Sequence, residues 1–275
     1  MFKSLKSLTA LMLCLTLWMA CPFPASALPP TPHSTLPDFP CYRSLNTLYA
    51  DAAALAAAYP ALATWTDIGD SWEKAQSGGA AGYDLFALKL TNSALTGQKP
   101  ALILVSGTHA RDLAPVELNL RFAEYLLAGY GTDPELTWLL NQAEVHIILS
   151  ANPDGRAVVE QQIASGEADE FGDAARKKNL NDAACSTHAL AGVDLDRNFP
   201  FQWQPGPTGC MNDYPGVAAA SEPETSALIA YLENNLGDYR ASGPDQPADT
   251  GARGLLVHLQ SYGNKVFYPY SYRAE

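Results

Sequence analysis

Short runs of apolar residues alternate along the chain with longer segments in which apolar positions recur every three or four residues. The runs ALILVSG (101–107) and EVHIILSAN (144–152) are almost continuously apolar, as in strands that are buried on both faces of a parallel sheet. YDLFALKLTN (83–92) alternates apolar and polar residues, which is typical of a strand. LLVHLQSY (255–262) is predicted as a further strand.

The longer periodic segments predict helices at 44–60, 117–131, 136–143 and 222–235. The first ends at a proline and the second closes with a glycine, both of which are common helix stops. The last begins with glutamates, which suit a helix N-terminus. The alternation predicts an α/β fold with a mixed, largely parallel sheet flanked by helices. In such folds the chemistry lies at the carboxyl ends of the strands.

The first residues are typical of an export signal. Lys3 and Lys6 precede an apolar run (8–20), and the Ala-Ser-Ala triplet that ends at Ala27 predicts cleavage after that residue. The apolar run is shorter than the ~20 residues that span a membrane, so no stable membrane anchor is expected. A lipid-modified Cys21 is the alternative, although bulky residues precede it. We therefore expect a secreted or periplasmic protein.

The organisation predicted from these features is a signal peptide (1–27), a proline-rich linker (28–40) and one domain (41–275). Hydrophobic residues make up 47% of the chain, which indicates a globular protein rather than a disordered one. Removing the two signal lysines changes the net charge from −12 to −14. An acidic protein of this kind is not expected to bind nucleic acid.

Candidate chemistry begins where the run 101–107 ends. His109 and Asp112 are three residues apart in SGTHARD, and an imidazole and a carboxylate at that spacing can bind one zinc ion. Arg111 between them can bind a carboxylate. ANPDGR (151–156) predicts only a loop. Each of these patterns is weak when it is taken alone.

The order of the motifs is more informative. GTHARD, NPDGR, RKKN, GVDLDRNF, YPGVAAASEPET and QSYGN followed by YPY resemble the zinc metallocarboxypeptidases of the carboxypeptidase A type. The resemblance covers about 41–275. It implies a zinc ion that lowers the pKa of a bound water, a glutamate that acts as general base, and hydrolysis of C-terminal residues. The implied partners are peptide or protein C-termini.

The resemblance also implies a ligand set for zinc. His109 corresponds to the first zinc histidine, Asp112 stands where the family has a glutamate ligand, and Asp194 corresponds to the aspartate that hydrogen-bonds the histidine. Gln260 stands at the third ligand position. His258, two residues earlier on the same side of a strand, is either a two-residue-shifted ligand or a hydrogen-bonded core histidine.

The implied substrate residues are mostly arginines. Arg176 corresponds to the catalytic residue that polarises the scissile carbonyl, Arg111 to one that contacts substrate, and Arg197 to the clamp on the substrate carboxylate. Asp196 stands where the family has an asparagine in the same substrate site. Tyr262 belongs to the Ser-Tyr pair that follows the third ligand position, and we expect it to be a substrate-binding residue.

The resemblance further implies a disulfide between Cys185 and Cys210, which leaves Cys41 unpaired. It also implies cis peptide bonds at Ser261–Tyr262 and Pro269–Tyr270. Such bonds cost ~3–4 kcal/mol where no proline follows, and they persist only where the surroundings enforce them.

In the family, the general-base glutamate lies well downstream of the Tyr-Pro-Tyr motif, and this chain ends at Glu275. We therefore expect a C-terminally truncated family member with an incomplete sheet, one weakly bound zinc ion and no measurable carboxypeptidase activity. Two alternatives remain open. One is a non-catalytic peptide-binding relative, and the other is an amidase or deacylase of the same fold.

Overall fold

A computed structural model describes residues 35–167, 176–187, 191–237, 239 and 249–268. The predicted signal peptide and residues 28–34 of the predicted linker lie outside this part of the chain. At the end of the linker segment, residues 35–36 form a short strand that pairs with the strand beginning at residue 39. Among the described residues, no helix is both long enough and apolar enough to cross a membrane.

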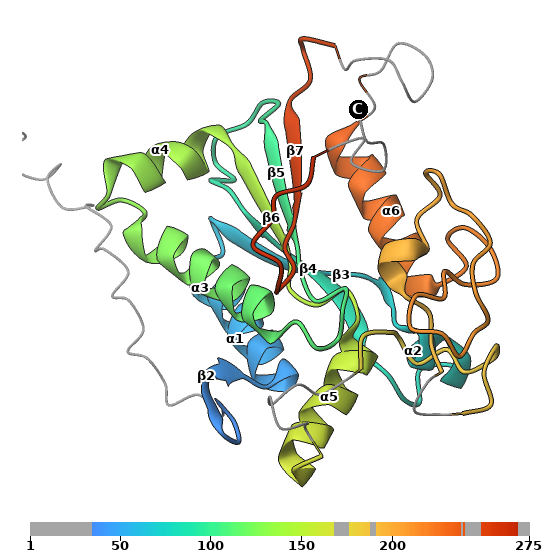
Figure 1. The fold of residues 1–275 in the computed structure, drawn as a ribbon. Coiled ribbons are helices and arrows are strands. Elements are labelled where there is room, and N and C mark those ends of the chain that lie inside the picture. Colours follow the sequence, from blue (N-terminus) through green and yellow to red (C-terminus); the bar gives the residue numbers. More distant parts are fainter. Residues whose placement is uncertain (1–34, 168–175, 188–190, 238, 240–248, 269–275) are drawn as a thin grey trace, which may run out of the picture. The chain divides into compact units, whose positions relative to one another are not determined.

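Strands and helices are interspersed along the chain, in part as alternating β and α elements (Figure 1). They are β1 (Thr35–Leu36), β2 (Phe39–Arg43), α1 (Leu45–Ala58), β3 (Ala63–Asp70), α2 (Trp72–Ser77), β4 (Asp84–Leu90), β5 (Ala101–Val105), α3 (Leu113–Gly129), α4 (Pro134–Gln142), β6 (Glu144–Ile148), α5 (Pro153–Ser165), the 3-10 turn η1 (Leu195–Arg197), α6 (Pro223–Leu236) and β7 (Gly254–His258).

The central sheet has the strand order β3-β4-β6-β5-β7. β5 is parallel to both β6 and β7, whereas β4 is antiparallel to both of its neighbours. The predicted mixed α/β fold is therefore confirmed, with its parallel part on the side of the sheet that holds β5 and β7. The carboxyl ends of these parallel strands meet at one edge, where the predicted chemistry lies.

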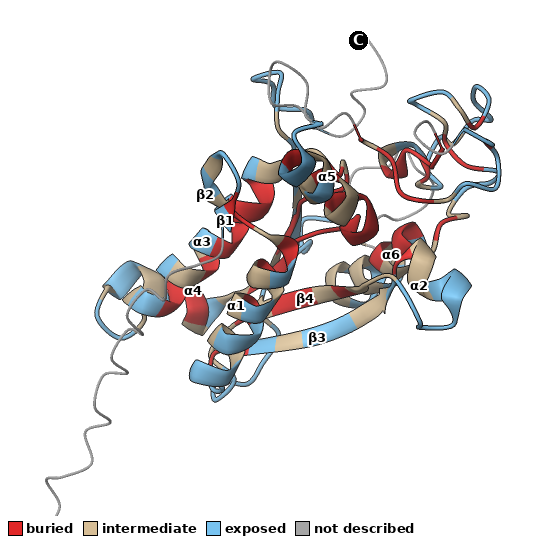
Figure 2. Cartoon of the chain, turned by 90° about the horizontal axis from the view of Figure 1, so that it is seen from below, coloured by how far each residue is buried: buried red, intermediate tan, exposed pale blue. Residues whose placement is uncertain are grey.

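Helices cover both faces of this sheet (Figure 1). One buried cluster joins α1, α3 and α4 to the strands through residues such as Leu48, Leu120 and Leu140. A second cluster on the other face packs Leu228 of α6 against Ile103 and other strand residues. Figure 2 shows the consequence for the strands: β4 is largely buried, whereas the edge strand β3 is partly exposed.

The prediction of a loop at ANPDGR (151–156) is wrong, because helix α5 begins at Pro153. Asn152 precedes the helix, and its Oδ1 accepts a hydrogen bond from the backbone N–H of Gly155. Pro153 occupies the first turn, where a missing N–H costs nothing. The same residues that favour a turn therefore also start a helix when a cap is available.

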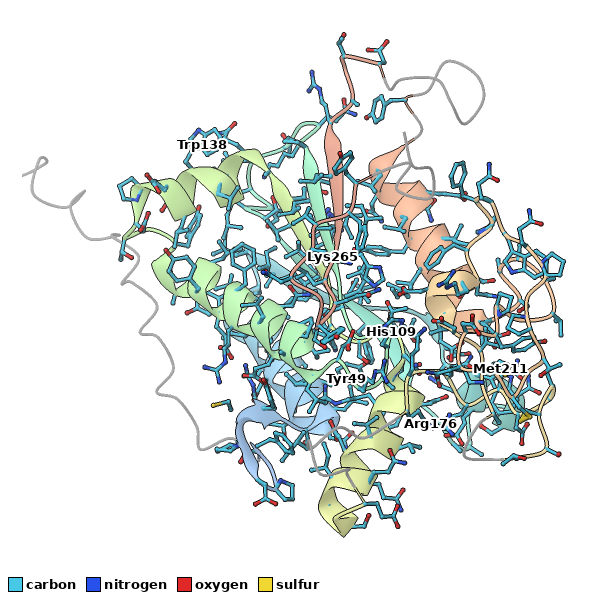
Figure 3. The ribbon with its side chains drawn as sticks, viewed as in Figure 1. Tyr49, His109, Trp138, Arg176, Met211 and Lys265 are labelled. Carbon is cyan, nitrogen blue, oxygen red and sulfur yellow. A yellow bond between two sulfur atoms is a disulfide. The ribbon has the colours of Figure 1, made fainter. Side chains whose placement is uncertain are left out.

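An aromatic group ties α1 to the exposed edge of the sheet. Tyr49, labelled in Figure 3, packs edge-on against Trp65 of β3 and Phe86 of β4, with ring centroids 5.6 and 5.4 Å away. Trp65 and Phe86 stack on each other at 4.6 Å. The phenol of Tyr49 also donates a hydrogen bond to the carbonyl of Asp84. These contacts explain how a strand with few buried positions is held in place.

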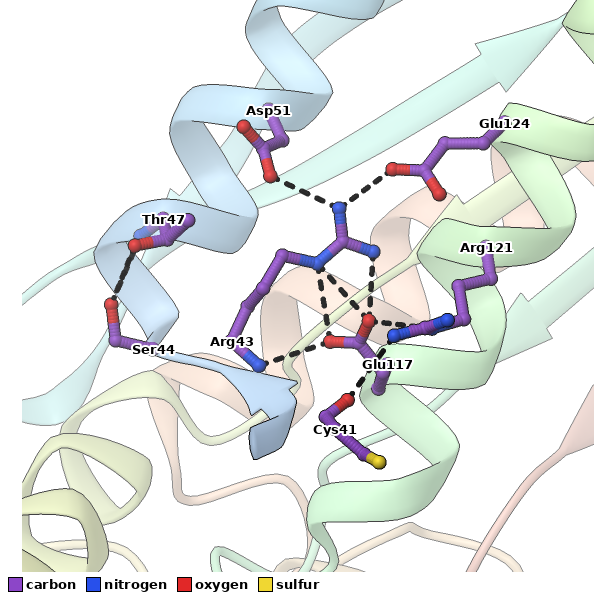
Figure 4. Close-up of polar contacts among 8 residues, drawn as sticks. All are labelled: Cys41, Arg43, Ser44, Thr47, Asp51, Glu117, Arg121 and Glu124. Carbon is purple, nitrogen blue, oxygen red and sulfur yellow. Dashed lines mark hydrogen bonds and ion pairs between the residues drawn. The ribbon is translucent and has the colours of Figure 1, made fainter. Parts of the chain in front are cut away.

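Arg43, at the end of β2, is the centre of a buried ionic cluster (Figure 4). Its guanidinium lies 2.9 Å from Glu117, 3.0 Å from Asp51 and 2.6 Å from Glu124. Its side chain is only 4% exposed. We call these four residues the Arg43 cluster; it joins β2 to α1 and α3.

Candidate metal and substrate site

His109 and Asp112 lie in the turn between β5 and α3. The backbone N–H of Asp112 donates to the carbonyl of His109, which closes the turn, and Asp112 occupies the N-cap position of α3 without a side-chain capping hydrogen bond. The turn brings Nδ1 of His109 to 3.5 Å from Oδ2 of Asp112. The predicted pair therefore faces one point, with Asp112 buried and the His109 side chain 14% exposed.

The segment around η1 brings two more carboxylates to the same histidine. Oδ1 of Asp194 lies 3.4 Å from Nε2 of His109, and Oδ2 of Asp196 lies 2.9 Å from it. The backbone N–H of Asp194 is held by the carbonyl of Tyr214, and its Oδ2 is 2.6 Å from Nζ of Lys177. We call His109, Asp112, Asp194 and Asp196 the His109 site. Figure 3 shows His109 beyond the end of the parallel strands.

The expected Cys185–Cys210 disulfide is present and closes the loop that contains Asp194 and Asp196. Cys41 is exposed and has a free thiol. The disulfide therefore restrains the loop from which Asp194 and Asp196 reach His109.

Residues at and just after the end of β7 also contact the His109 site. Nε2 of His258 lies 2.7 Å from Oγ1 of Thr108, and its Nδ1 lies 3.6 Å from Oδ1 of Asp196. The amide of Gln260 donates a hydrogen bond to Asp196, while the hydroxyl of Ser261 donates to Asp112 at 2.6 Å. His258 and Gln260 both reach Asp196, although β7 ends at His258 and Gln260 lies beyond it, so the strand predicted over 255–262 is shorter than expected.

The charges of the His109 site shift its pKa values strongly. Burial would lower the pKa of His109, but the nearby carboxylates of Asp112, Asp194 and Asp196 outweigh it and raise this pKa to about 11. Burial would raise the pKa of Asp112 and of Asp196, yet contact with His109 leaves both pKa values below their ordinary range. Burial lowers the pKa of His258. The site therefore favours one positive charge among several negative ones.

The predicted substrate residues are less closely grouped. Arg176 is buried, and its Nη1 donates to the carbonyls of Asn179 and Ala191. The Arg197 side chain is 64% exposed, with its Nε 3.8 Å from Asp194. Arg111 is half-buried in the turn before α3.

Tyr262 is fully exposed and has a positive φ of 81°. The expectation of a cis bond at Ser261–Tyr262 is wrong, because the described residues contain none. The physical reason is that the exposed Tyr262 has no packing to enforce so costly a conformation. Pro269–Tyr270 lies outside the described residues.

Three residues of the site were missed by sequence reasoning: Lys177, Thr108 and Ser261. Lys177 holds Asp194, Thr108 holds His258 and Ser261 holds Asp112. Lys177 stands next to Arg176 in RKKN, so its position in that motif was the available signal. Ser261 belongs to the Ser-Tyr pair that follows Gln260, so that motif was its signal. Thr108 gave none, because threonine is common near the end of any strand.

Comparison with known proteins decides the family. The profile of the zinc carboxypeptidase family matches residues 48–275. The chain belongs to the zinc carboxypeptidase family. Among family relatives, it is 26% identical over 239 residues to the inactive metallocarboxypeptidase ECM14 of Saccharomyces cerevisiae, which covers 85% of this chain and 48% of the yeast protein.

Mouse carboxypeptidase A2 is 27% identical over 239 residues, which cover 86% of this chain and 48% of the mouse protein. The chain thus spans about half the length of the curated relatives it matches. The crystal structure of thrombin activatable fibrinolysis inhibitor superposes with a TM-score of 0.66 at 25% identity, over 85% of this chain and 51% of that chain. Carboxypeptidase A from Helicoverpa armigera, at 22% identity, shares the fold with a TM-score of 0.61 over 81% of this chain and 46% of that chain.

The family implies zinc, so the residues at the family's ligand positions have to be compared with the site. His109 and Asp112 face each other, but both oxygens of Asp112 already accept hydrogen bonds from Ser261. The exposed Gln260 donates its amide to Asp196. The Gln260 amide is thus engaged by Asp196, and the ligand set of His109, Asp112 and Gln260 stays a prediction. His109, Asp194 and Asp196 do bring three ligand atoms within 4.8 Å of one another.

Proposed function

We propose that the protein is an exported, zinc-dependent metallocarboxypeptidase-like protein that recognises peptide or protein C-termini, and that hydrolysis by this chain is impaired. Membership of the zinc carboxypeptidase family supports the reaction class. One structural observation carries the impairment. At the position where the resemblance implies a metal-binding histidine, Gln260 is hydrogen-bonded to Asp196 instead.

Recognition of a C-terminal carboxylate is assigned to Arg197. Its side chain is 64% exposed, so a peptide can reach it. A guanidinium binds a carboxylate through two parallel hydrogen bonds, which favours a free C-terminus over a blocked one. The adjacent Asp196 opposes this binding, because it adds a negative charge where the family has a neutral asparagine. Binding is therefore expected to be weak.

Catalysis is expected to suffer more than binding. The Arg176 guanidinium donates to two backbone carbonyls of its own loop, so part of its donor capacity is used by the fold. Burial also lowers the pKa of Arg176, which reflects the cost of keeping its charge away from water. An oxyanion is stabilised well only by donors that already point at it.

A non-catalytic peptide-binding protein is the second candidate. The substitution at Gln260 favours it, because a site without the third histidine can still present Arg197 to a carboxylate. The yeast relative ECM14 is named an inactive metallocarboxypeptidase, which supports inactivity in this chain as well. This candidate predicts peptide binding with no turnover under any metal condition.

The test uses the 275-residue chain with one peptide in two forms, a free C-terminal carboxylate and a C-terminal amide. We expect the free form to bind more tightly and no C-terminal residue to be released above a zinc-free blank, measured by fluorescence anisotropy and mass spectrometry. Arg197→Ala should remove the preference for the free form. Arg253→Ala should keep it, because Arg253 is an exposed arginine that precedes the opposite end of β7.

The outcomes separate the parts of the proposal. Clear turnover of the free peptide would overturn the impairment, and equal binding of both forms would overturn carboxylate recognition. Export is checked by N-terminal sequencing of the recovered protein. It should begin at Leu28, and an intact Met1 in the recovered protein would contradict export.

A further inference from the structure

A hollow of about 360 Å³ lies at the start of α4 and is lined by 131–134, Thr137, Trp138 and Asn141. The lining residues of α4 share one side of the helix, because they are three or four residues apart. The turn that precedes α4 supplies the rest of the lining. This volume is at the small end of the range for small-molecule sites, about 300–1,000 Å³. We call this feature the Trp138 hollow.

Trp138 supplies the apolar surface of the hollow. Its side chain is 65% exposed, and Figure 3 shows it on α4, well apart from His109. Within the described part of the chain, its ring contacts no other aromatic ring and its indole N–H donates no hydrogen bond. A single exposed apolar residue needs no explanation. The inference therefore depends on the polar groups around this ring.

Asn141 presents hydrogen-bond donors in a fixed orientation. Its Oδ1 accepts hydrogen bonds from Nδ2 of Asn92 at 2.8 Å and from the hydroxyl of Tyr130 at 2.9 Å. These two bonds use both lone pairs of the oxygen, so the amide is held in one orientation. Its Nδ2 has no hydrogen-bond acceptor among the residues that the structure describes.

Asp133 presents an acceptor, and the turn around it is held by hydrogen bonds. Oδ1 of Asp133 accepts from the backbone N–H groups of Glu135 and Leu136 at 2.8 and 3.2 Å, whereas no described residue donates to Oδ2. The Thr137 hydroxyl accepts from the N–H of Gly131 and donates to the carbonyl of Asp133. The hollow is therefore ordered before a ligand binds, which lowers the entropic cost of binding.

An apolar ring beside fixed donors and an acceptor matches the chemistry of a sugar. A sugar ring has C–H groups that pack on an aromatic face, and each of its hydroxyls both donates and accepts. A cation would leave the donors of Asn141 unsatisfied, and an apolar side chain would also leave Asp133 without a donor. An anionic ligand is disfavoured by the carboxylates of Asp133 and Glu135.

We propose that the Trp138 hollow binds one ring of a neutral sugar, with the C–H face of the ring on the indole and its hydroxyls bonded to Asn141 and Asp133. The inference does not rest on the proposed function, because the hollow contains no residue of the His109 site and none of the predicted substrate residues.

The test is saturation-transfer NMR of the 275-residue chain with four separate probes: the methyl glycosides of glucose, galactose and mannose, and N-acetylglucosamine. We expect at least one to bind through its C–H groups. Trp138→Ala should weaken that binding about tenfold or more, as loss of a central tryptophan typically does. The matched control is Tyr125→Ala, which removes a 59% exposed aromatic residue of α3 that does not line the hollow and should leave the affinity unchanged. Circular dichroism checks that both variants fold.

A second variant tests the polar part of the site. Asn141→Asp keeps the side-chain size and the oxygen that accepts from Asn92 and Tyr130, but it replaces the N–H donors. We expect the sugar affinity to fall about threefold to tenfold, as for the loss of one hydrogen bond. Gln142→Glu makes the same change of charge at an exposed neighbour outside the hollow and should have no effect.

The outcomes are decisive for the hollow alone. Failure of all four sugars to bind the wild type, or binding that is unchanged in Trp138→Ala, would overturn the inference. Binding of tetramethylammonium but of no sugar would overturn it in favour of a cation site. Retention of the wild type but not of Trp138→Ala on cellulose or chitin would support a polymeric source of the sugar, and binding of the small probes alone would support a free sugar or a short glycan. None of these results changes the peptide assay, which tests the proposed function.

Discussion

The Arg43 cluster and the His109 site share one design: a single cationic side chain lies among three carboxylates. They differ in the cation. Arginine stays protonated at any physiological pH and offers five donors in a rigid plane. Histidine can release its proton, and its neutral nitrogen can bind a metal ion. The same acidic surroundings therefore hold a permanent positive charge on Arg43 and a titratable one on His109.

The two regions also differ in what carries their acids. In the Arg43 cluster, the three carboxylates come from α1 and α3, where the backbone is rigid. In the His109 site, Asp194 and Asp196 come from a loop with one short 3-10 turn. A site on a loop can adjust to a ligand more easily than one on two helices.

The largest effect is expected from breaking the Arg43 cluster. Arg43→Met removes the buried partner of Glu117 and leaves only the exposed Arg121 beside it. Such a loss typically costs about 3–5 kcal/mol of the free energy of unfolding. The low pKa of Glu117, where hydrogen bonds from Arg43 outweigh the effect of burial, shows how far this carboxylate depends on Arg43. Urea unfolding of the metal-free chain measures the effect.

The matched control is Arg121→Ala. Arg121 contacts the same Glu117 at 2.7 Å, but its side chain is 60% exposed. Exposed pairs contribute about 0–1 kcal/mol, so this variant should unfold close to the wild type. If the two variants lose similar stability, burial is not what distinguishes the Arg43 cluster.

A smaller effect is expected when the loop of the His109 site is released. Replacing Cys185 and Cys210 together by serine removes the disulfide, which spans 25 residues, and should cost about 2–4 kcal/mol. The cost should add to that of Arg43→Met in a combined variant, because the two regions share no residues. A clearly non-additive result in urea unfolding would mean that the regions are coupled.

The smallest expected effect is a change of titration. In the metal-free protein, the carboxylates raise the pKa of His109 from 6.5 to about 11. Because the folded-state pKa is raised, this group stabilises the fold fully below pH 6.5, and the contribution is lost as the pH rises toward 11.

Asp196→Asn should lower the pKa of His109, so that the same loss occurs at lower pH. NMR titration of the metal-free variant measures the pKa. Asp51→Asn in the Arg43 cluster is the control and should leave the titration of His109 unchanged. An unaltered pKa in Asp196→Asn would show that this carboxylate does not act on the histidine.

Much of the fold could be predicted from the sequence, because the buried strands and amphipathic helices have strong periodicity. The predicted runs 101–107 and 144–152 match β5 and β6 closely. β3 was not predicted, because its sequence ATWTDIGD has little apolar alternation and is held by its neighbours. α5 was missed because its first residues also favour a turn.

The site was only partly predictable for a related reason. His109 and Asp112 are three residues apart, so their spacing alone predicted that they lie together. The contact between Asp194 and His109 was available only from the family resemblance. That Asp196 faces the same histidine depends on how a distant loop packs, which no local sequence pattern indicates. The roles assigned to Arg111, Arg176 and Arg197 stay predictions.

Helix α3 connects the two regions mechanically. Asp112 immediately precedes it beside His109, and Glu117 follows five residues later beside Arg43, about 7.5 Å along the axis. One rigid body therefore carries part of both cation environments. Local opening of its first two turns must expose both at once, so hydrogen exchange of these amides should report a single cooperative unit rather than two independent ones.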